Sequence, residues 1–322
     1  MLACLAPMLL AAAAPHVQLR SASGIARNGS DLIIVGDDTP GTLFRYRLRA
    51  GDWPSGNGPL LAEIEIAGAR AERFGGTGAM DLEGVDVLDD GRIVVLSETL
   101  KSLLTEDSVV TVYPEPMGEI GGRGMEGVAI RRDGQVAGLW EGGFFSPEYL
   151  PTWIAGTGDI QSGPQLALLC VHPLPDVAGT EVCPGGNGVV PLQIPAAPDA
   201  TQAFRATDLV WADDGQSLIV LLSSTNATTT VFRYKWLQRF STSGAAIGDP
   251  VNLCDRGFLP AHVRSGKAGN FEGLGWFEPG KSLVLINDYS GAATAVIIAM
   301  DPWQPNDESV ACDQVLAAEG GD

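Results

Sequence analysis

The sequence predicts an all-β fold: a single-domain β-propeller with five four-stranded blades, with six blades as the alternative. Two observations lead to this prediction. One type of segment recurs along the chain, with a polar start, alternating apolar residues, a Gly-containing turn and an apolar run. Further strand-like segments follow each copy, and repeats of this kind are typical of propellers. The polar starts of the five copies are Ser23, Glu83, Glu126, Asp208 and Glu272.

The spacing within each copy predicts a β-hairpin. The first polar residue is followed fifteen positions later by another polar residue. In an antiparallel pair with a short turn, residues equidistant from the turn face each other, so each polar pair is expected at the hairpin's open end. The pairs are Ser23 and Asp38, Glu83 and Glu98, Glu126 and Glu141, Asp208 and Ser223, and Glu272 and Asn287. The turn signals between them are Asn28-Gly29, Asp90-Gly91, Asp133-Gly134, Asp214-Gly215 and Pro279-Gly280.

The start of the chain resembles a secretory signal. Residues 1–14 are apolar and end in small residues, which predicts a signal peptide followed by a β-propeller domain over residues 15–322. The leader is too short to span a bilayer. We therefore expect a periplasmic or secreted protein without membrane insertion once the leader is removed. Residues 16–20 alternate like a lone strand, which we expect to close the ring against residues 293–300 or 310–316.

The hairpins and the segments after them predict the strands of each blade. The first copy supplies residues 23–38, 42–48 and 61–66, and the second supplies 83–98 and 109–113. The third supplies 126–141, 165–172 and 189–194, the fourth 208–223, 230–237 and 245–253, and the fifth 272–288 and 293–300. The long gap between the third and fourth copies leaves room for a sixth, degenerate blade.

Charge excludes some classes of partner. The chain has 39 Asp and Glu against 20 Lys and Arg, a formal net charge of −19 at pH 7. An acidic surface repels nucleic-acid phosphates and anionic lipids, so we expect neither as a partner. We expect a divalent cation and a small-molecule ligand or substrate as partners instead. The alternative explanation is that the acidic charge only keeps the protein soluble. We expect a monomer.

Cysteine usage predicts two disulfides. Four of the five Cys remain once the leader is removed, and an even number in an exported chain favours disulfide bonds. Cys170 with Cys183 and Cys254 with Cys312 form one possible pairing, and two other pairings stay open. The chain has no Cys-x-x-Cys motif and only three His, which disfavours zinc binding and thiol catalysis.

The polar starts predict an acidic ring. In a propeller the first strand of each blade lines the central channel. Glu83, Glu126, Asp208 and Glu272 are therefore expected at one channel mouth, with Ser23 completing the ring. Crowded carboxylates repel one another, and a hard cation with about six to eight oxygen ligands offsets that repulsion. We predict a Ca²⁺ site whose metal ligands are Glu83, Glu126, Asp208, Glu272 and Asn287.

Arginine offers a second way to neutralise the ring. Arg20, Arg123 and Arg205 stand three residues before three of the five polar starts. An inter-blade ring of Arg–carboxylate bridges is therefore the structural alternative to a bound cation. Met80 stands at that position before Glu83, so a bound ion is expected nearest Glu83.

Cation and Arg together would suit hydrolysis of a small ester, phosphoester or lactone without a covalent nucleophile. The predicted catalytic residues are Glu83, Glu126, Arg123 and Arg205. No Gly-x-Ser-x-Gly motif occurs, which disfavours a serine hydrolase. The alternative function is a non-enzymatic extracytoplasmic binding or scaffold propeller with a structural Arg–carboxylate ring.

Two stretches carry a resemblance to a known family. Residues 80–98 and 270–291, with their Glu-Gly starts, resemble repeats of the bacterial exported phytase-like β-propellers, which have esterase-like activity. The pattern is more distantly similar to SdiA-regulated propellers and to the gluconolactonase and strictosidine-synthase-like group, whose central Ca²⁺ lies at the channel mouth. The resemblance covers nearly the whole mature chain and implies channel positions for Glu83, Glu126 and Glu272. Asp208-Leu209 and Ser23 depart from the Glu-Gly pattern.

Overall fold

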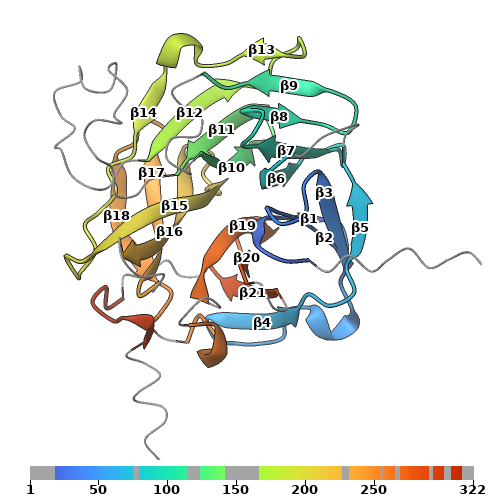
Figure 1. The fold of residues 1–322 in the computed structure, drawn as a ribbon. Coiled ribbons are helices and arrows are strands. Elements are labelled where there is room, and N and C mark those ends of the chain that lie inside the picture. The colour runs from blue at the N-terminus through green and yellow to red at the C-terminus, as the bar shows by residue number, and fades with distance from the viewer. Residues whose placement is uncertain are drawn as a thin grey trace, which may run out of the picture.

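In the computed structural model, five sheets surround a central axis as the blades of a propeller (Figure 1). The structure describes residues 19–74, 80–114, 124–141, 167–226, 232–255, 257–264, 269–289, 293–300 and 306–313. The inner strands of successive blades contact one another, and the inner strand of the fifth blade contacts that of the first. The ring is therefore closed, and the predicted five-bladed propeller is confirmed.

The first three blades each start with one of the predicted hairpins. Blade 1 contains β1 (Ala22–Asn28), β2 (Asp31–Gly36), β3 (Thr42–Arg47) and β5 (Arg70–Arg73). Blade 2 contains β6 (Leu82–Val87), β7 (Ile93–Ser97), β8 (Ser102–Leu104), β9 (Val109–Val112) and the added parallel strand β13 (Thr180–Glu181). Blade 3 contains β10 (Met125–Ile130), β11 (Gln135–Trp140), β12 (Leu168–Pro173) and β14 (Val189–Pro191).

The last two blades are made from the C-terminal part of the chain and one earlier strand. Blade 4 contains β15 (Gln202–Trp211), β16 (Ser217–Asn226), β17 (Lys235–Ser241) and β18 (Ala246–Asn252). Blade 5 contains β19 (Phe271–Glu278), β20 (Ser282–Asn287), β21 (Thr294–Ala299) and β4 (Leu60–Glu65). Where the connections are described, they contain the short 3-10 helices η1 (Ala50–Asp52), η4 (Pro184–Gly186) and η5 (Ala261–Val263).

The predicted hairpin turns are all present. Each turn places a Gly at positive φ, which L side chains rarely adopt, and the five glycines are Gly29, Gly91, Gly134, Gly215 and Gly280. The turns all lie at the same end of the channel, and the open ends of the hairpins lie at the other. We call these two ends the turn mouth and the acidic mouth.

The core lies between the blades. Five apolar clusters are present, one for each pair of neighbouring blades. A middle strand is therefore buried on both faces, which explains why the apolar residues run consecutively rather than alternate. Leu32 to Val35 in β2 are an example, since all four side chains are buried.

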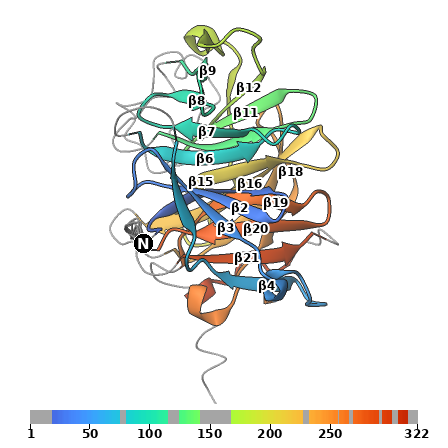
Figure 2. The same cartoon turned by 90° about the vertical axis from the view of Figure 1, so that its right-hand side faces the viewer.

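β4 takes the place beside β21 that the sequence predicts for a closing strand at residues 16–20, and of that predicted strand only Leu19 and Arg20 are described. β4 pairs antiparallel with β21, with Thr294 opposite Glu65, and lies beyond it at the edge of blade 5 (Figure 2). Leu19 and Arg20 are in no strand, and residues 1–18, with the predicted signal peptide, lie outside the described residues. β4 closes the ring because its buried Ile64 packs into the apolar cluster between blades 5 and 1.

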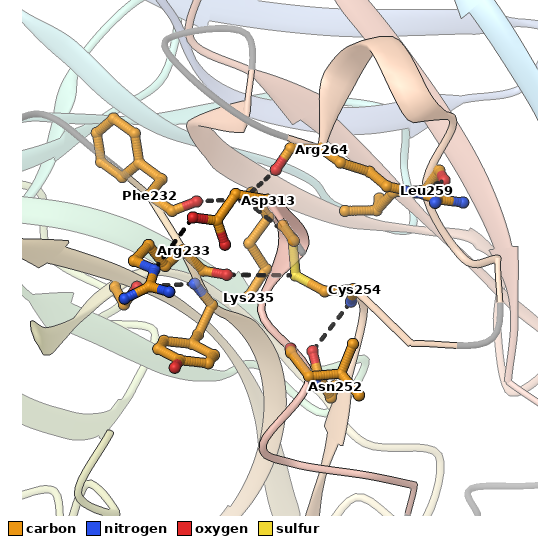
Figure 3. The surroundings of a disulfide bond; sticks show 12 residues. Phe232, Arg233, Lys235, Asn252, Cys254, Leu259, Arg264 and Asp313 are labelled. Carbon is orange, nitrogen blue, oxygen red and sulfur yellow. Dashed lines mark hydrogen bonds and ion pairs between the residues drawn. A yellow bond between two sulfur atoms is a disulfide. The ribbon is translucent and has the colours of Figure 1, made fainter. Parts of the chain in front are cut away.

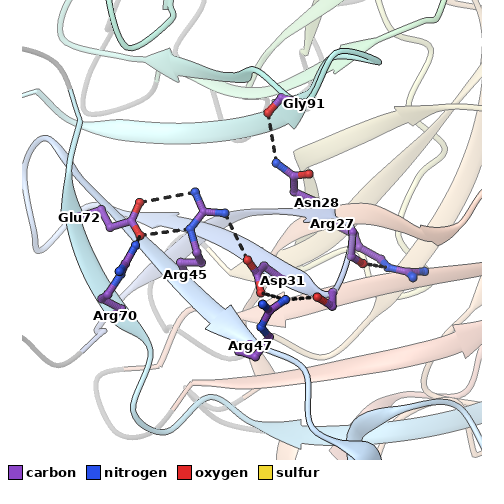
Figure 4. Close-up of polar contacts among 10 residues, drawn as sticks. Arg27, Asn28, Asp31, Arg45, Arg47, Arg70, Glu72 and Gly91 are labelled. Carbon is purple, nitrogen blue, oxygen red and sulfur yellow. Dashed lines mark hydrogen bonds and ion pairs between the residues drawn. The ribbon is translucent and has the colours of Figure 1, made fainter.

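The outer strand of blade 1 is β5 rather than the predicted 61–66 segment. β5 has the sequence Arg-Ala-Glu-Arg, and its Glu72 accepts a bond from Arg45 Nε at 3.1 Å (Figure 4). Arg45 also lies 3.4 Å from Asp31, which links three strands of the blade. A short, charged strand suits an outer edge because it discourages pairing with another chain.

Two disulfides join Cys170 to Cys183 and Cys254 to Cys312, so the first of the three open pairings is confirmed. The second disulfide attaches the C-terminal segment to the end of blade 4 (Figure 3). Beside it, the buried Lys235 donates to the carbonyl oxygens of Phe232 at 2.9 Å and Arg264 at 3.0 Å. Burial lowers the pKa of Lys235 to about 7.

Candidate functional site

Each inner strand contains a β-bulge at which the ladder shifts by one residue. A bulged residue has no partner across the ladder, and bulges commonly re-aim a side chain next to a functional site. The bulged residues are Ser23, Glu83, Glu126, Thr207 and Glu272. Four of these five are the polar starts that the sequence predicts for the ring.

The Gly that follows the bulge allows the inner strands to approach closely. A Cβ added at Gly24 would lie 2.6 Å from the carbonyl oxygen of Glu83 in the next blade. At Gly84 it would lie 3.0 Å from the backbone nitrogen of Val128. Neighbouring inner strands therefore touch backbone to backbone at this level, and the repeated Glu-Gly pair combines a ring carboxylate with the space that this contact requires.

Blade 4 departs from this pattern. The ring position belongs to Thr207, and Asp208 occupies the position that is Gly in the other blades. Only 1% of Asp208 is exposed, and its carboxylate accepts the backbone N–H groups of Leu209 at 2.8 Å and Leu274 at 2.7 Å. Since Leu274 belongs to blade 5, Asp208 joins two blades. Burial, opposed by these two hydrogen bonds, raises the pKa of Asp208 well above its usual value.

Carboxyl groups from four blades gather at the acidic mouth and perturb one another. Burial raises the pKa of Glu83, and the charges of Glu126 and Asp37 raise it further. Burial likewise raises the pKa of Glu126, with further increases from Glu141 and Glu272. The groups that interact in this way are Asp37, Asp81, Glu83, Glu98, Glu126, Glu141, Glu272 and Asp288. A site of this kind needs protons or cations to neutralise it.

Three of these carboxylates form the tightest group. Ligand oxygens of Asp37, Asp81 and Glu83 all lie within 4.8 Å of one another. Glu83 is buried and 5% exposed, whereas Asp37 lies at the open rim. Desolvation by the surrounding protein raises the pKa of Asp37 to about 6, against a hydrogen bond that Ser23 Oγ donates to it, and the charges of Asp81 and Asp288 raise it further. Ser23 is therefore the ring residue that orients Asp37.

Arg205 is the basic residue that the described part of the chain places beside these carboxylates. Its Nη1 lies 2.7 Å from Glu141 Oε1, and its Nη2 lies 2.5 Å from Glu272 Oε1. Burial alone would lower the pKa of Arg205, but the charges of Glu141 and Glu272 outweigh it and raise the pKa. Arg205 therefore stays protonated and joins blades 3, 4 and 5 through one guanidinium group.

Two Asn side chains next to the ring have different roles. Asn270 Nδ2 donates to Glu272 at 2.7 Å and to Asp288 at 3.0 Å. The buried Oδ1 of Asn270 has no hydrogen-bond partner among the described residues. Asn287 Oδ1 instead accepts the backbone N–H of Thr294 at 2.7 Å, within blade 5.

The structure places only some of the predicted residues together. Glu83, Glu126, Glu272 and Arg205 lie at the acidic mouth, as expected. The carboxylate oxygens of Asp208 and the amide oxygen of Asn287 accept hydrogen bonds from backbone N–H groups instead. Arg20 is exposed, and Arg123 lies outside the described residues. The roles of these residues in catalysis or metal binding stay predictions.

Sequence reasoning missed Asp37, Asp81 and Asn270. It assumed an unbroken ladder, which put Asp38 opposite Ser23. The ladder instead pairs Ala22 with Gly36, which leaves the bulged Ser23 without a partner across the ladder. Ser23 Oγ donates to Asp37, and Asp38 accepts a bond from Ser21 at 2.9 Å.

Comparisons with known proteins identify no family. No family model matches the chain, and no curated protein matches it. Among solved structures, the chain is similar to the PQQ-bound aldose sugar dehydrogenase of Streptomyces coelicolor, with 14% identity and a TM-score of 0.38 over 87% of this chain and 95% of that chain. It is similar to a gluconolactonase of Xanthomonas campestris, with 11% identity and a TM-score of 0.39 over 88% and 87%. It is also similar to a streptogramin B lyase, with 8% identity and a TM-score of 0.39 over 88% and 95%.

The resemblance to phytase-like propellers stays a prediction, while a gluconolactonase is among the similar structures. In the described part of the chain, no helix has the length and apolar character needed to cross a membrane.

Proposed function

We propose that the protein binds a divalent cation, with Ca²⁺ as the first candidate, at the acidic mouth through Asp37, Asp81 and Glu83. The observation that carries this proposal is the 4.8 Å limit on the distances between their ligand oxygens. Ca²⁺ takes oxygen ligands at about 2.3–2.6 Å, so two ligands of one ion lie at most about 5 Å apart. The three carboxylates meet this requirement.

The electrostatics of Glu83 support the same proposal. Its four strongest charged neighbours are all carboxyl groups, namely Glu126, Asp37, Asp81 and Glu272. Arg205 is not among the groups that act most strongly on Glu83, so a bound cation would be needed to offset the repulsion between Glu83 and these carboxylates. Asn270 Oδ1 is a further buried oxygen at the mouth, and neutral amide oxygens are common Ca²⁺ ligands.

We extend the proposal to the hydrolysis of a small ester, phosphoester or lactone at this mouth. When bound, the cation would supply a Lewis acid. Arg205 holds a fixed positive charge near Glu126 and would stabilise negative charge that develops on a substrate oxygen. Burial and Glu141 raise the pKa of Glu126, which suits a general base that takes a proton from water.

The second candidate is a non-enzymatic binding or scaffold propeller. The bridge from Arg205 to Glu141 and Glu272 supports it, because one guanidinium group ties three blades together without any substrate. In either case we propose an exported protein. The two disulfides support this, since such bonds persist in oxidising compartments.

The test is calorimetric titration of the EDTA-dialysed protein with CaCl₂ at pH 7.5. Glu83→Gln is expected to abolish the heat of binding. Asp107→Asn is the matched control, because Asp107 is an exposed carboxylate of the same blade and its removal is expected to leave binding unchanged. Absence of heat with the wild-type protein would overturn the cation proposal.

Activity is tested separately with ester, phosphoester and lactone panels. Turnover that EDTA abolishes and that Glu126→Gln lowers by about 100-fold would support hydrolysis, since a general base contributes about 10²–10⁴-fold. Ca²⁺ binding without any turnover would favour the binding or scaffold function instead.

A further inference from the structure

The channel contains a cavity at the turn mouth, on the opposite side from the acidic mouth. Its volume is about 710 Å³, within the range of about 300–1,000 Å³ for small-molecule sites. All five inner strands line it, together with residues of the hairpin turns. The carboxylates Asp37, Asp81 and Glu83 are not among its lining residues.

The walls of this cavity combine polar and apolar surface in similar amounts. Aliphatic side chains such as Ile25, Val87 and Ile130 line it, together with the aromatic residues Trp211 and Trp276. The two indole N–H groups donate to the carbonyl oxygens of Ala129 at 3.2 Å and Trp211 at 2.8 Å. The indoles therefore need no hydrogen bond from a ligand, and the apolar part of the walls suits a hydrocarbon body.

Three arginines line the cavity and all contact other groups, and the 82% exposed Arg132 lies 3.8 Å from Asp89. Arg27 donates to the carbonyl oxygens of Gly29, at 2.8 Å, and Phe277, and its guanidinium lies 4.4 Å from the Phe277 ring. Arg131 makes two bonds to Asp133, at 2.7 and 2.6 Å, and a third to the Gly215 carbonyl. These contacts join neighbouring blades and frame the opening.

Three carboxylates line the cavity, and Asp86 is the one that belongs to an inner strand. It accepts the backbone N–H groups of Val87 at 2.7 Å and of Ile130, in blade 3, at 2.6 Å. Among the described residues, no Lys, Arg or His side chain forms an ion pair with Asp86. Burial raises the pKa of Asp86 to about 6, against these two hydrogen bonds, so the group is ionised at pH 7.5. Each of its oxygens has a second lone pair to offer.

Asp86 is half-buried, and no side chain among the described residues forms an ion pair with it, so its charge lies at the cavity wall without a counter-charge. We propose that the cavity at the turn mouth binds a small organic cation, specifically a primary amine with an apolar body, whose ammonium group pairs with Asp86. The aliphatic and indole walls bury the hydrocarbon part, and aromatic faces also attract cations. This site is separate from the acidic mouth and does not depend on a bound metal ion.

The test uses three probes with the same hydrocarbon chain and different charges: hexylamine, hexanol and hexanoate. Each is titrated calorimetrically into the full-length protein at pH 7.5 in EDTA, so that metal binding plays no part. Hexylamine is expected to bind at least about tenfold more tightly than hexanol, and hexanoate is expected not to bind. Equal binding of hexylamine and hexanoate would overturn the proposal.

Two variants and one control locate the site. Asp86→Asn is expected to weaken hexylamine binding at least about tenfold. Asp213→Asn removes a carboxylate that lines the same cavity and serves as the matched control, with binding changed less than about twofold. An equal loss of hexylamine affinity in both variants would mean that the amine is attracted to the acidic protein as a whole, and would refute the proposed site.

Val87→Phe keeps the proposal testable if Asp86→Asn fails to fold. Val87 is partly exposed and lines the cavity, so the larger side chain fills space without changing a charge. Hexylamine binding is expected to fall at least about tenfold, and unchanged binding would overturn the proposal.

Discussion

Arg205 in blade 4 pairs with Glu272 in blade 5, with 2.5 Å between Nη2 and Oε1, and reaches Glu141 of blade 3 with its other terminal nitrogen. The side chain of Arg205 is 18% exposed and that of Glu141 is 5% exposed. The attraction between these charges is therefore weakly screened, and their separation leaves buried carboxylates without a counter-charge.

Arg205→Met should consequently destabilise the protein by about 3–5 kcal/mol at pH 7.5, the range for breaking a buried pair. Urea unfolding would measure it. Arg132→Met is the control, since Arg132 is 82% exposed and lies 3.8 Å from Asp89. The two variants having the same midpoint would contradict the role of Arg205.

Ca²⁺ should stabilise the protein more at pH 7.5 than at pH 5. Asp37 and Asp288 have pKa values raised to about 6 in the folded protein, chiefly by burial. A raised folded pKa means that protonation stabilises the fold at low pH and that this contribution is lost as pH rises through about 6. Ca²⁺ replaces the lost protons only when the carboxylates are ionised.

Thermal unfolding with and without Ca²⁺ measures this dependence. At pH 7.5 and about 100-fold above the dissociation constant, the ion should add about 2.7 kcal/mol. At pH 5 the shift in Tm should be much smaller. An equal shift at both pH values would show that the ion binds elsewhere.

Gly24→Ala should destabilise the contact between blades 1 and 2. The added Cβ would lie 2.6 Å from the carbonyl oxygen of Glu83 and 3.0 Å from the backbone nitrogen of Val85, and backbone atoms cannot rotate away. Overpacking of this kind costs about 1–3 kcal/mol, measurable by urea unfolding. At Gly58 an added Cβ meets nothing within 4 Å, so Gly58→Ala should unfold like the wild type.

Asp208→Asn should lower stability and leave Ca²⁺ binding intact. An amide has one acceptor oxygen, so one of the N–H groups of Leu209 and Leu274 would lose its partner, at a cost of about 1–3 kcal/mol. Calorimetric titration with CaCl₂ should give the wild-type affinity. A large loss of affinity would instead make Asp208 a metal ligand, as the sequence pattern alone predicts.

The two disulfides should differ in what they contribute. The bond between Cys254 and Cys312 closes a separation of 58 residues, against 13 for Cys170 and Cys183. Chain-entropy estimates give about 4 kcal/mol for the longer loop and about 3 kcal/mol for the shorter one. Unfolding of the double Cys→Ala variant of each pair would measure both, and a larger loss for Cys170 and Cys183 would contradict the estimate.

The sequence by itself determined the architecture. The five turns with their glycines and the apolar runs between them are local features, and local periodicity is sufficient to predict hairpins and their number. The repeats also predict that three glutamates lie at one channel mouth, because each holds the equivalent position in its repeat: Glu83, Glu126 and Glu272.

Only the tertiary structure decided which groups meet. A bulge adds one residue to one strand without changing the pattern of residue types, so the pairing of Ser23 with Asp37 and the ring position of Thr207 had no sequence signal. Ring closure by β4 and the pairing of Arg205 with Glu141 and Glu272 depend on which blades become neighbours. Burial of apolar side chains between blades determines which blades are neighbours. The spacing of residues along the chain does not predict it.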